Sequence, residues 1–204
     1  FKAKIKKSLG VDFPNSCKEQ LWGAIEAVFK SWNGNRARQY REIEGIPDNL
    51  GTAVNIQSMV FGNLGNMSGT GVAFTRNPIN GLNKLYGEWL PNAQGEDIVA
   101  GIRTPYPIND DSATIKSQKS FSLEYQHPAI YKQLLKIKKI LENEYLDMQD
   151  IEFTIEKKKL WMLQTRKGKR TAQATVTIAI DMKNEKIINS EQCIKRIKPN
   201  HLDD

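Results

Sequence analysis

The first 34 residues carry apolar side chains at intervals of three and four residues, which is the period of an amphipathic helix. Ser16 and Glu19 stand at the two ends of a capping-box sequence, in which both side chains bond free backbone N–H groups at a helix start. Gly34 is a natural stop for this helix. A further helix is predicted after His127-Pro128, because apolar residues recur at helical spacing at Ile130, Leu134, Ile137, Leu141 and Tyr145.

From Gly51 the pattern changes to an alternation of apolar and polar residues, which predicts strands. The turn-rich segment 63–71 separates two of them, and Asn80-Gly81 is a strong hairpin signal. The predicted strands are 54–60, 72–75 and 84–90. Residues 51–103 are therefore expected to form a twisted antiparallel meander.

Two segments have weaker patterns. Residues 104–124 contain Pro105 and Pro107 and show little periodicity, which indicates a long surface loop. Residues 171–183 fit a strand or a helix on pattern alone.

Composition narrows the class of protein. With 204 residues, 39% hydrophobic and 26% charged, the chain has the composition of a globular protein with one substantial core or two small ones. No apolar run is long enough to span a bilayer, and no apolar stretch follows the basic N-terminus, so neither a membrane partner nor a signal peptide is expected. Cys17 and Cys193 match no metal or redox spacing, which predicts free thiols in a reducing cytoplasm.

A net charge of +7 raises the question of nucleic-acid binding. The basic residues are spread over several segments, and aromatic residues are not interleaved with them as stacking platforms would require. A polyphosphate site explains local positive charge equally well. No nucleic-acid partner is therefore expected.

Residues 150–166 predict a hairpin. Residues 150–156 alternate without a fault, so one face is apolar (Ile151, Phe153, Ile155) and the other is polar (Asp150, Glu152, Thr154, Glu156). With Lys157-Lys158-Lys159 as the loop, the predicted cross-strand pairs are Ile155 with Trp161, Phe153 with Leu163, Glu152 with Gln164, and Asp150 with Arg166.

The last two pairs bring two carboxylates, an amide and a guanidinium together on one face. Carboxylates two residues apart on a strand lie roughly 7 Å from each other. Oxygen ligands at this spacing suit Mg²⁺, which also takes phosphate oxygens, and Arg166 could hold a phosphate by its planar fork. The alternative is an exposed hairpin face with ordinary cross-strand pairs.

The segment Ser68-Gly69-Thr70-Gly71 stands between two predicted strands. Its glycines would let backbone N–H groups approach an anion, and its hydroxyls would add donors. It is neither a Walker A loop nor a Rossmann fingerprint, and a structural hairpin turn is the commoner explanation.

Four blocks in this order, residues 51–62, 68–78, 92–97 and 148–166, resemble the ATP-grasp nucleotide-binding domain of the pyruvate, phosphate dikinase family. The resemblance covers nearly the whole chain and is weakest at 104–124 and at both ends. It implies an α+β fold in which an ATP-grasp subdomain, with an antiparallel sheet and flanking helices, follows a small helical segment. The implied boundaries are 1–48 for the helical segment, 49–185 for the subdomain, and 186–204 for the start of a linker towards a phosphohistidine domain.

The resemblance also implies roles for individual residues. Those near the nucleotide are Gln57, Met59 and Val60 on the adenine side, Thr70 and Gly71 in the polyphosphate-binding loop, and the acidic Glu88 and Glu96. The implied Mg²⁺ ligands are Asp150, Glu152 and Gln164. Arg166 matches the arginine directed at the phosphates, and the implied catalytic residues are Glu152, Gln164 and Arg166.

Enzymes of this family interconvert ATP, pyruvate and phosphate with AMP, phosphoenolpyruvate and diphosphate through a phosphohistidine carrier. The implied partners are ATP and the other domains of a longer chain: the N-terminal ATP-grasp half, the phosphohistidine domain and the pyruvate-binding barrel. The full enzyme is expected to be a cytoplasmic homodimer. The carrier lies in a Gly-Gly-Met-Thr-Ser-His stretch, and neither His127 nor His201 has such neighbours. We therefore expect the carrier outside these residues and no dikinase activity from them alone.

Two alternatives remain open. One is the nucleotide domain of a phosphoenolpyruvate synthase, which uses water in place of phosphate as the acceptor, although residues 93–97 fit the dikinase better. The other, from a different class, is a non-catalytic basic module that binds nucleic acid.

Overall fold

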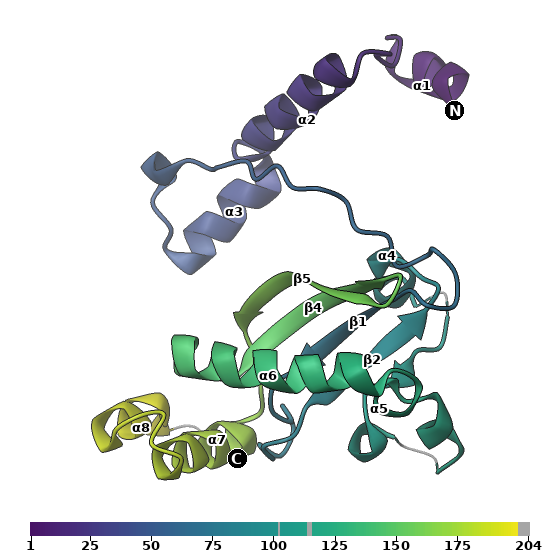
Figure 1. The fold of residues 1–204 in the computed structure, drawn as a ribbon. Helices are drawn as coiled ribbons and strands as arrows, with labels where there is room; N and C mark the ends of the chain where they lie inside the picture. Colours follow the sequence, from purple (N-terminus) through teal and green to yellow (C-terminus); the bar gives the residue numbers. More distant parts are fainter. Residues whose placement is uncertain (102, 114–115, 200–204) are drawn as a thin grey trace. The chain divides into compact units, whose positions relative to one another are not determined.

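The computed structural model describes residues 1–101, 103–113 and 116–199, so His201 and the rest of 200–204 lie outside the described residues. The chain forms two compact units, Phe1–Ser58 and Met59–Asp204 (Figure 1). The boundaries expected after residues 48 and 185 stay a prediction. Within the described part of the chain, none of the helices combines the length and the apolar character needed to cross a bilayer.

The first unit consists of short helices, which are α1 (Lys2–Leu9), α2 (Cys17–Ser31), α3 (Asn35–Glu44) and the 3₁₀ helix η1 (Asp48–Leu50). The predicted cap of α2 is present, because the Ser16 hydroxyl accepts a hydrogen bond from the Glu19 N–H at 3.5 Å. Residues 1–34 do not form one helix. Gly10, at φ 71°, ends α1, while α2 ends at Ser31, shortly before the predicted stop at Gly34, which caps the start of α3.

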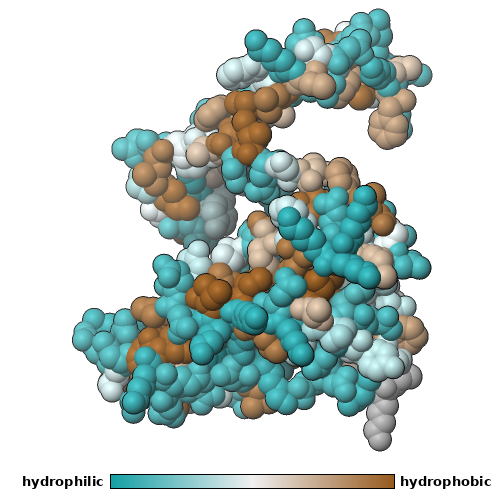
Figure 2. All heavy atoms as spheres, in the orientation of Figure 1, coloured by the Kyte–Doolittle hydropathy of each residue, from teal (hydrophilic) through white to brown (hydrophobic). Residues whose placement is uncertain are grey.

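This first unit has little apolar interior of its own. The α2 side chains Leu21, Trp22, Val28 and Phe29 are exposed, and Figure 2 shows hydrophobic atoms on the surface of this helix. By contrast Arg41 is buried. Its guanidinium lies 3.9 Å from the centroid of the Trp32 ring and donates hydrogen bonds to the Trp32 carbonyl and to Asp48. A cation–π contact and an ion pair therefore hold α3 against its neighbours.

The second unit is built on a five-stranded antiparallel sheet with the order β3-β2-β1-β4-β5. Its strands are β1 (Gly69–Phe74), β2 (Tyr86–Pro91), β3 (Tyr106–Pro107), β4 (Gln149–Glu156) and β5 (Lys159–Lys167). Its helices are α4 (Gly95–Val99), α5 (Leu123–Gln126), α6 (Pro128–Tyr145), α7 (Ala172–Asn184) and α8 (Ser190–Arg196), with the 3₁₀ helices η2 (Asp110–Ser112) and η3 (Lys116–Phe121). The α+β fold is confirmed.

Several predicted elements are corrected. Residues 54–60 form no strand, and Gly69, Thr70 and Gly71 belong to β1, so the glycine-rich turn ends before them. The expected loop 104–124 contains β3, η2, η3 and the start of α5. The ambiguous segment 171–183 is helical, and it begins where the Thr171 hydroxyl accepts a hydrogen bond from the Ala174 N–H at 3.1 Å.

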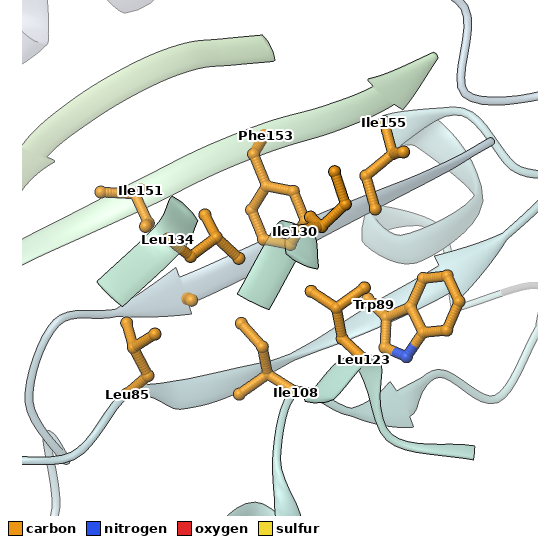
Figure 3. Packing of buried hydrophobic residues seen from close by; sticks show 10 residues of the cluster. Leu85, Trp89, Ile108, Leu123, Ile130, Leu134, Ile151, Phe153 and Ile155 are labelled. Carbon is orange, nitrogen blue, oxygen red and sulfur yellow. The ribbon is translucent and has the colours of Figure 1, made fainter. Parts of the chain in front are cut away.

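The main core lies between the sheet and α6, which runs across one sheet face (Figure 1). Ile151, Phe153 and Ile155 project from β4 into a cluster with Ile130 and Leu134 of α6 (Figure 3). All three β4 side chains are completely buried. The predicted apolar face of the strand and the predicted stripe of the helix are thus two sides of one core.

A second cluster joins α7 and α8 to Phe74 and Met148, where β1 ends and β4 begins. A buried ion network reinforces this end of the sheet. Arg76, with no exposed surface, donates two hydrogen bonds to Glu142 of α6, at 3.1 and 3.0 Å, and two to Glu185, at 3.1 and 2.7 Å. The helix α8 packs on this end of the sheet through Cys193, and the linker expected over 186–204 stays a prediction.

The β4–β5 hairpin has the predicted register on only one side of a β-bulge. Asp150 pairs with Arg166 and Glu152 pairs with Gln164, as predicted. Beyond the bulge the pairs are Phe153 with Met162, Thr154 with Trp161, and Ile155 with Leu160, so the predicted pairs Phe153–Leu163 and Ile155–Trp161 were wrong.

The bulge lets β5 place apolar residues on the core face and polar residues on the opposite face. Leu163 is an extra residue, and it shifts the alternation of the strand by one position. Leu160 and Met162 can therefore pack against the core, while Gln164 and Arg166 face away from it. The loop holds only Lys157 and Lys158, whose φ angles of 48° and 68° fit a two-residue type I′ turn.

Candidate functional site

The sheet face opposite α6 carries the predicted metal ligands together with Glu88 and Arg166. Residues directly opposite each other on antiparallel strands project to the same face, so the register defines rows across the sheet. The central row is Glu88, Val72, Glu152 and Gln164. The next row is Tyr86, Phe74, Asp150 and Arg166. Because neighbouring rows lie about 7 Å apart, the two carboxylates, the amide and the guanidinium of the hairpin lie close together.

Arg166 is ion-paired with both hairpin carboxylates. Its Nε lies 2.8 Å from Oδ2 of Asp150, and its Nη2 lies 3.8 Å from Oε1 of Glu152. The hydrogen bond and charge of Asp150 raise the pKa of Arg166, which keeps the guanidinium charged. The side chain of Arg166 is 60% exposed, against 38% for Glu152 and 14% for Asp150. The guanidinium is thus the member of this group most open to water.

Glu88 lies at the β2 end of the central row, beside a cavity of about 430 Å³. Its neighbours in the cavity wall include Val72, Tyr86 and Tyr106, and none of the described lining residues is basic. Burial raises the pKa of the Glu88 carboxyl. Glu88 therefore differs in its surroundings from Asp150 and Glu152, which are both ion-paired with the guanidinium of Arg166.

The donor set of Asp150, Glu152 and Gln164 fits Mg²⁺. Two carboxylates and an amide offer the hard oxygen atoms that Mg²⁺ prefers, and they leave coordination positions for water and phosphate oxygens. Among residues 1–101, 103–113 and 116–199, no group of three or more His, Cys, Asp or Glu side chains could hold a metal ion. Three protein oxygen donors would leave the other positions around an octahedral ion to water or to a bound ligand.

Thr70 and Gly71 lie in β1 and are engaged in packing. The Thr70 hydroxyl is buried and donates a hydrogen bond to the Phe153 carbonyl at 3.2 Å. A Cβ on Gly71 would lie 2.3 Å from Cζ of Phe153. The absence of a side chain at Gly71 thus makes room for the Phe153 ring, which gives this glycine a structural reason besides the predicted phosphate contact.

The remaining predicted residues lie outside the two rows. Met59 and Val60 belong to an irregular segment that leads to Gly62, whose carbonyl accepts a hydrogen bond from the Ala93 N–H at 3.0 Å. Glu96 is exposed in the first turn of α4, just after β2. Gly62 and α4 lie at the Gly69 end of β1, whereas Asp150 and Arg166 lie at its Phe74 end. Gln57 is exposed and belongs to the first unit.

The sequence did not indicate a polar clasp at the base of the hairpin. Asp147, just before β4, accepts hydrogen bonds from both Nη atoms of Arg170, at 2.6 and 2.9 Å, and Arg196 of α8 lies 3.7 Å away. Burial alone would raise the pKa of Asp147, but the hydrogen bonds and charge of Arg170, the charge of Arg196 and the Met148 N–H together outweigh it and lower the pKa. The clasp fixes the strand ends next to Asp150 and Arg166. Its only sequence signal is a charged residue beside a buried strand.

Comparison with known proteins identifies the family of this chain. A family model described as the pyruvate phosphate dikinase AMP/ATP-binding domain matches residues 13–124 and 109–187. The pyruvate, phosphate dikinase of Rhizobium meliloti is 55% identical over 203 residues, which is 100% of this chain and 23% of that protein. The enzyme of Clostridium symbiosum is 51% identical over 204 residues, which is 100% of this chain and 22% of that protein. The chloroplastic enzyme of Flaveria trinervia is 52% identical over 203 residues, which is 100% of this chain and 20% of that protein.

An antiparallel sheet with this polar face and these matches defines a nucleotide-binding domain. The chain belongs to the family of pyruvate phosphate dikinase AMP/ATP-binding domains. It spans about a fifth of the length of the relatives named above.

Proposed function

We propose that this chain binds Mg²⁺-ATP on the sheet face opposite α6 and forms the phosphoryl-donor site of a pyruvate, phosphate dikinase. The observation that carries the proposal is the placement of Asp150, Glu152, Gln164 and Arg166 in two neighbouring rows. Asp150, Glu152 and Gln164 would hold Mg²⁺, which when bound neutralises charge on phosphate oxygens. Arg166 would grip a phosphate with two parallel N–H groups.

The order of residues along the sheet supports an extended nucleotide. The adenine would bind near Met59 and Val60, and Glu96 follows β2 in the first turn of α4. Thr70 and Gly71 are the next positions along β1, and the row of Glu88, Glu152 and Gln164 follows. Arg166 lies one row further, so base, polyphosphate, metal and arginine would follow each other along one direction.

In the complete enzyme the proposed donor site would phosphorylate a carrier histidine outside these 204 residues. The full reaction would convert ATP, pyruvate and phosphate into AMP, phosphoenolpyruvate and diphosphate. This chain's residues would act by positioning and by charge stabilisation, which dominate catalysis of phosphoryl transfer. The other ATP-grasp half, the phosphohistidine domain, the pyruvate-binding barrel, a homodimeric state and a cytoplasmic location belong to the same proposal.

Calorimetric titration of the full chain with Mg²⁺-ATP tests the binding site. Glu152→Gln removes one charge from the proposed metal site with little change in shape, and we expect it to weaken binding about ten-fold or more, because a hydrogen-bonded or metal-bound charge is lost. Glu144→Gln, an exposed glutamate on α6, is the matched control and should bind like the wild type. Absence of Mg²⁺-ATP binding to the wild type, or equal binding by Glu152→Gln, would refute the proposal.

Half-reactions of the full-length enzyme test the role in turnover. Gln164→Ala should slow phosphorylation of the carrier by ATP much more than it lowers the melting temperature. Exchange between phosphoenolpyruvate and the carrier should continue, because it would use another domain. Equal loss of both half-reactions in a folded variant would place the donor site elsewhere.

A further inference from the structure

We infer that Arg166 makes divalent-cation binding at Asp150 and Glu152 conditional on a polyphosphate. The inference rests on the proposed function and adds a second role for the guanidinium. In this structure the guanidinium does not reach away from the hairpin. It lies against the two carboxylates that are proposed to hold the metal, 2.8 Å from one and 3.8 Å from the other.

The guanidinium and a metal ion compete for the same oxygen atoms. Mg²⁺ binds oxygen at about 2.0–2.1 Å and requires a free lone pair. Oδ2 of Asp150 already accepts the hydrogen bond from Nε of Arg166. A cation bound at this oxygen would also lie within a few ångströms of the guanidinium charge, which repels it. The ion pair therefore lowers the affinity of these carboxylates for a free cation.

Within 4 Å, Arg166 is the only basic side chain paired with Asp150 or Glu152 among the residues that the structure describes. The three side chains carry a formal charge of −1 together, and the two carboxylates alone carry −2. Turning this one side chain away thus doubles the negative charge that faces an incoming metal.

A polyphosphate supplies the reason for Arg166 to turn. The arginine is 60% exposed and stands on β5, the edge strand of the sheet, so its side chain can reorient without a change in the backbone. A phosphate accepts the planar fork in two parallel hydrogen bonds and takes the guanidinium off the carboxylates. The freed carboxylates then bind the metal that the phosphates also hold. Because such coupling is reciprocal, metal and polyphosphate strengthen each other's binding. The site thus selects a metal–nucleotide complex over the free cation.

Titration of the full chain with Mn²⁺ alone, followed by the electron paramagnetic resonance signal of the free ion, tests this inference without nucleotide. Arg166→Gln should bind Mn²⁺ about three- to ten-fold more tightly than the wild type, since it removes both a competing ion pair and a repelling charge. The double variant Arg166→Gln with Glu152→Gln should lose this gain. Lys167→Gln is the matched control, because it removes the same charge from the next residue of β5, whose side chain projects to the other face.

The same Arg166→Gln variant should bind Mg²⁺-ATP more weakly than the wild type, so one substitution moves the two affinities in opposite directions. Unchanged or weaker Mn²⁺ binding by Arg166→Gln, or an equal gain in Lys167→Gln, overturns the inference even where the wild type binds Mg²⁺-ATP. If the wild type fails to bind Mg²⁺-ATP, the proposed function falls and the polyphosphate half of the inference falls with it. Failure of the inference is thus seen in the Mn²⁺ titration, and failure of the proposed function is seen in the Mg²⁺-ATP titration. Melting temperatures of all variants verify that each is folded.

Discussion

Two explanations account for a glycine at position 71: a contact with phosphate, or room for the Phe153 ring. Substitution of Gly71 tests the second. A methyl group at Gly71 would lie 2.3, 2.7 and 2.9 Å from three atoms of this ring, which is completely buried. Overpacking of this kind costs about 1–3 kcal/mol. Replacing glycine by alanine recovers about 0.4–1 kcal/mol through the unfolded chain. We therefore expect Gly71→Ala to lower the free energy of unfolding by about 1–2 kcal/mol, or the melting temperature by roughly 2–8 °C.

A double-mutant cycle separates the two reasons. Phe153→Leu alone should cost roughly 1–2 kcal/mol, but in its presence the Gly71→Ala methyl group gains space, so the double variant should be more stable than the sum of the single losses by about 1 kcal/mol. Gly95→Ala is the control, because a Cβ there meets nothing within 4 Å. Chemical denaturation of the four variants gives all the required values. Strict additivity, or a Gly71→Ala protein as stable as the wild type, would refute the packing explanation.

Three further predictions concern charged groups. Glu142→Ala should lower the free energy of unfolding by about 3–5 kcal/mol in chemical denaturation, because it leaves the buried Arg76 with half of its partners. The Arg170 clasp lowers the pKa of Asp147 below its ordinary value of 3.8. The stabilisation that ionised Asp147 gives the folded state is therefore complete above that value and is lost as pH falls through the folded-state pKa. Asp147→Asn should be less stable than the wild type at neutral pH, and the melting curves of the two proteins should converge in acid. Burial raises the pKa of Glu88, so ionisation of this carboxyl disfavours the folded state. Glu88→Gln should melt at the wild-type temperature or above it at pH 7. The difference should shrink as pH falls through the folded-state pKa of Glu88 and vanish below the ordinary value of 4.5.

Alternation along the sequence predicted which side chains share a face, but it did not distinguish a strand with a partner from a segment without one. The alternation over 150–156 correctly separated the buried Ile151 and Phe153 from the carboxylates on the other face. The same kind of alternation over 54–60 led to a wrong strand, and Ile56 there is 64% exposed. Alternation reports only which side chains share a face, whereas a strand also needs a neighbour for its backbone hydrogen bonds. Nothing in a local pattern supplies that neighbour.

The packing of the apolar half of β5 depends on one residue that the alternation did not indicate. Leu160, Met162, Gln164 and Arg166 occur at every second position, so a regular β5 would place all four on one face. The first two are apolar and the last two are polar, and no single face of this sheet suits both pairs. The bulge at Leu163 resolves this conflict, since it lets Leu160 and Met162 pack on the core and places the amide and the guanidinium beside Glu152 and Asp150. A change from apolar to polar within one face of a predicted strand is therefore itself a signal of a bulge, and in this chain it marks the row where the proposed metal ligands meet.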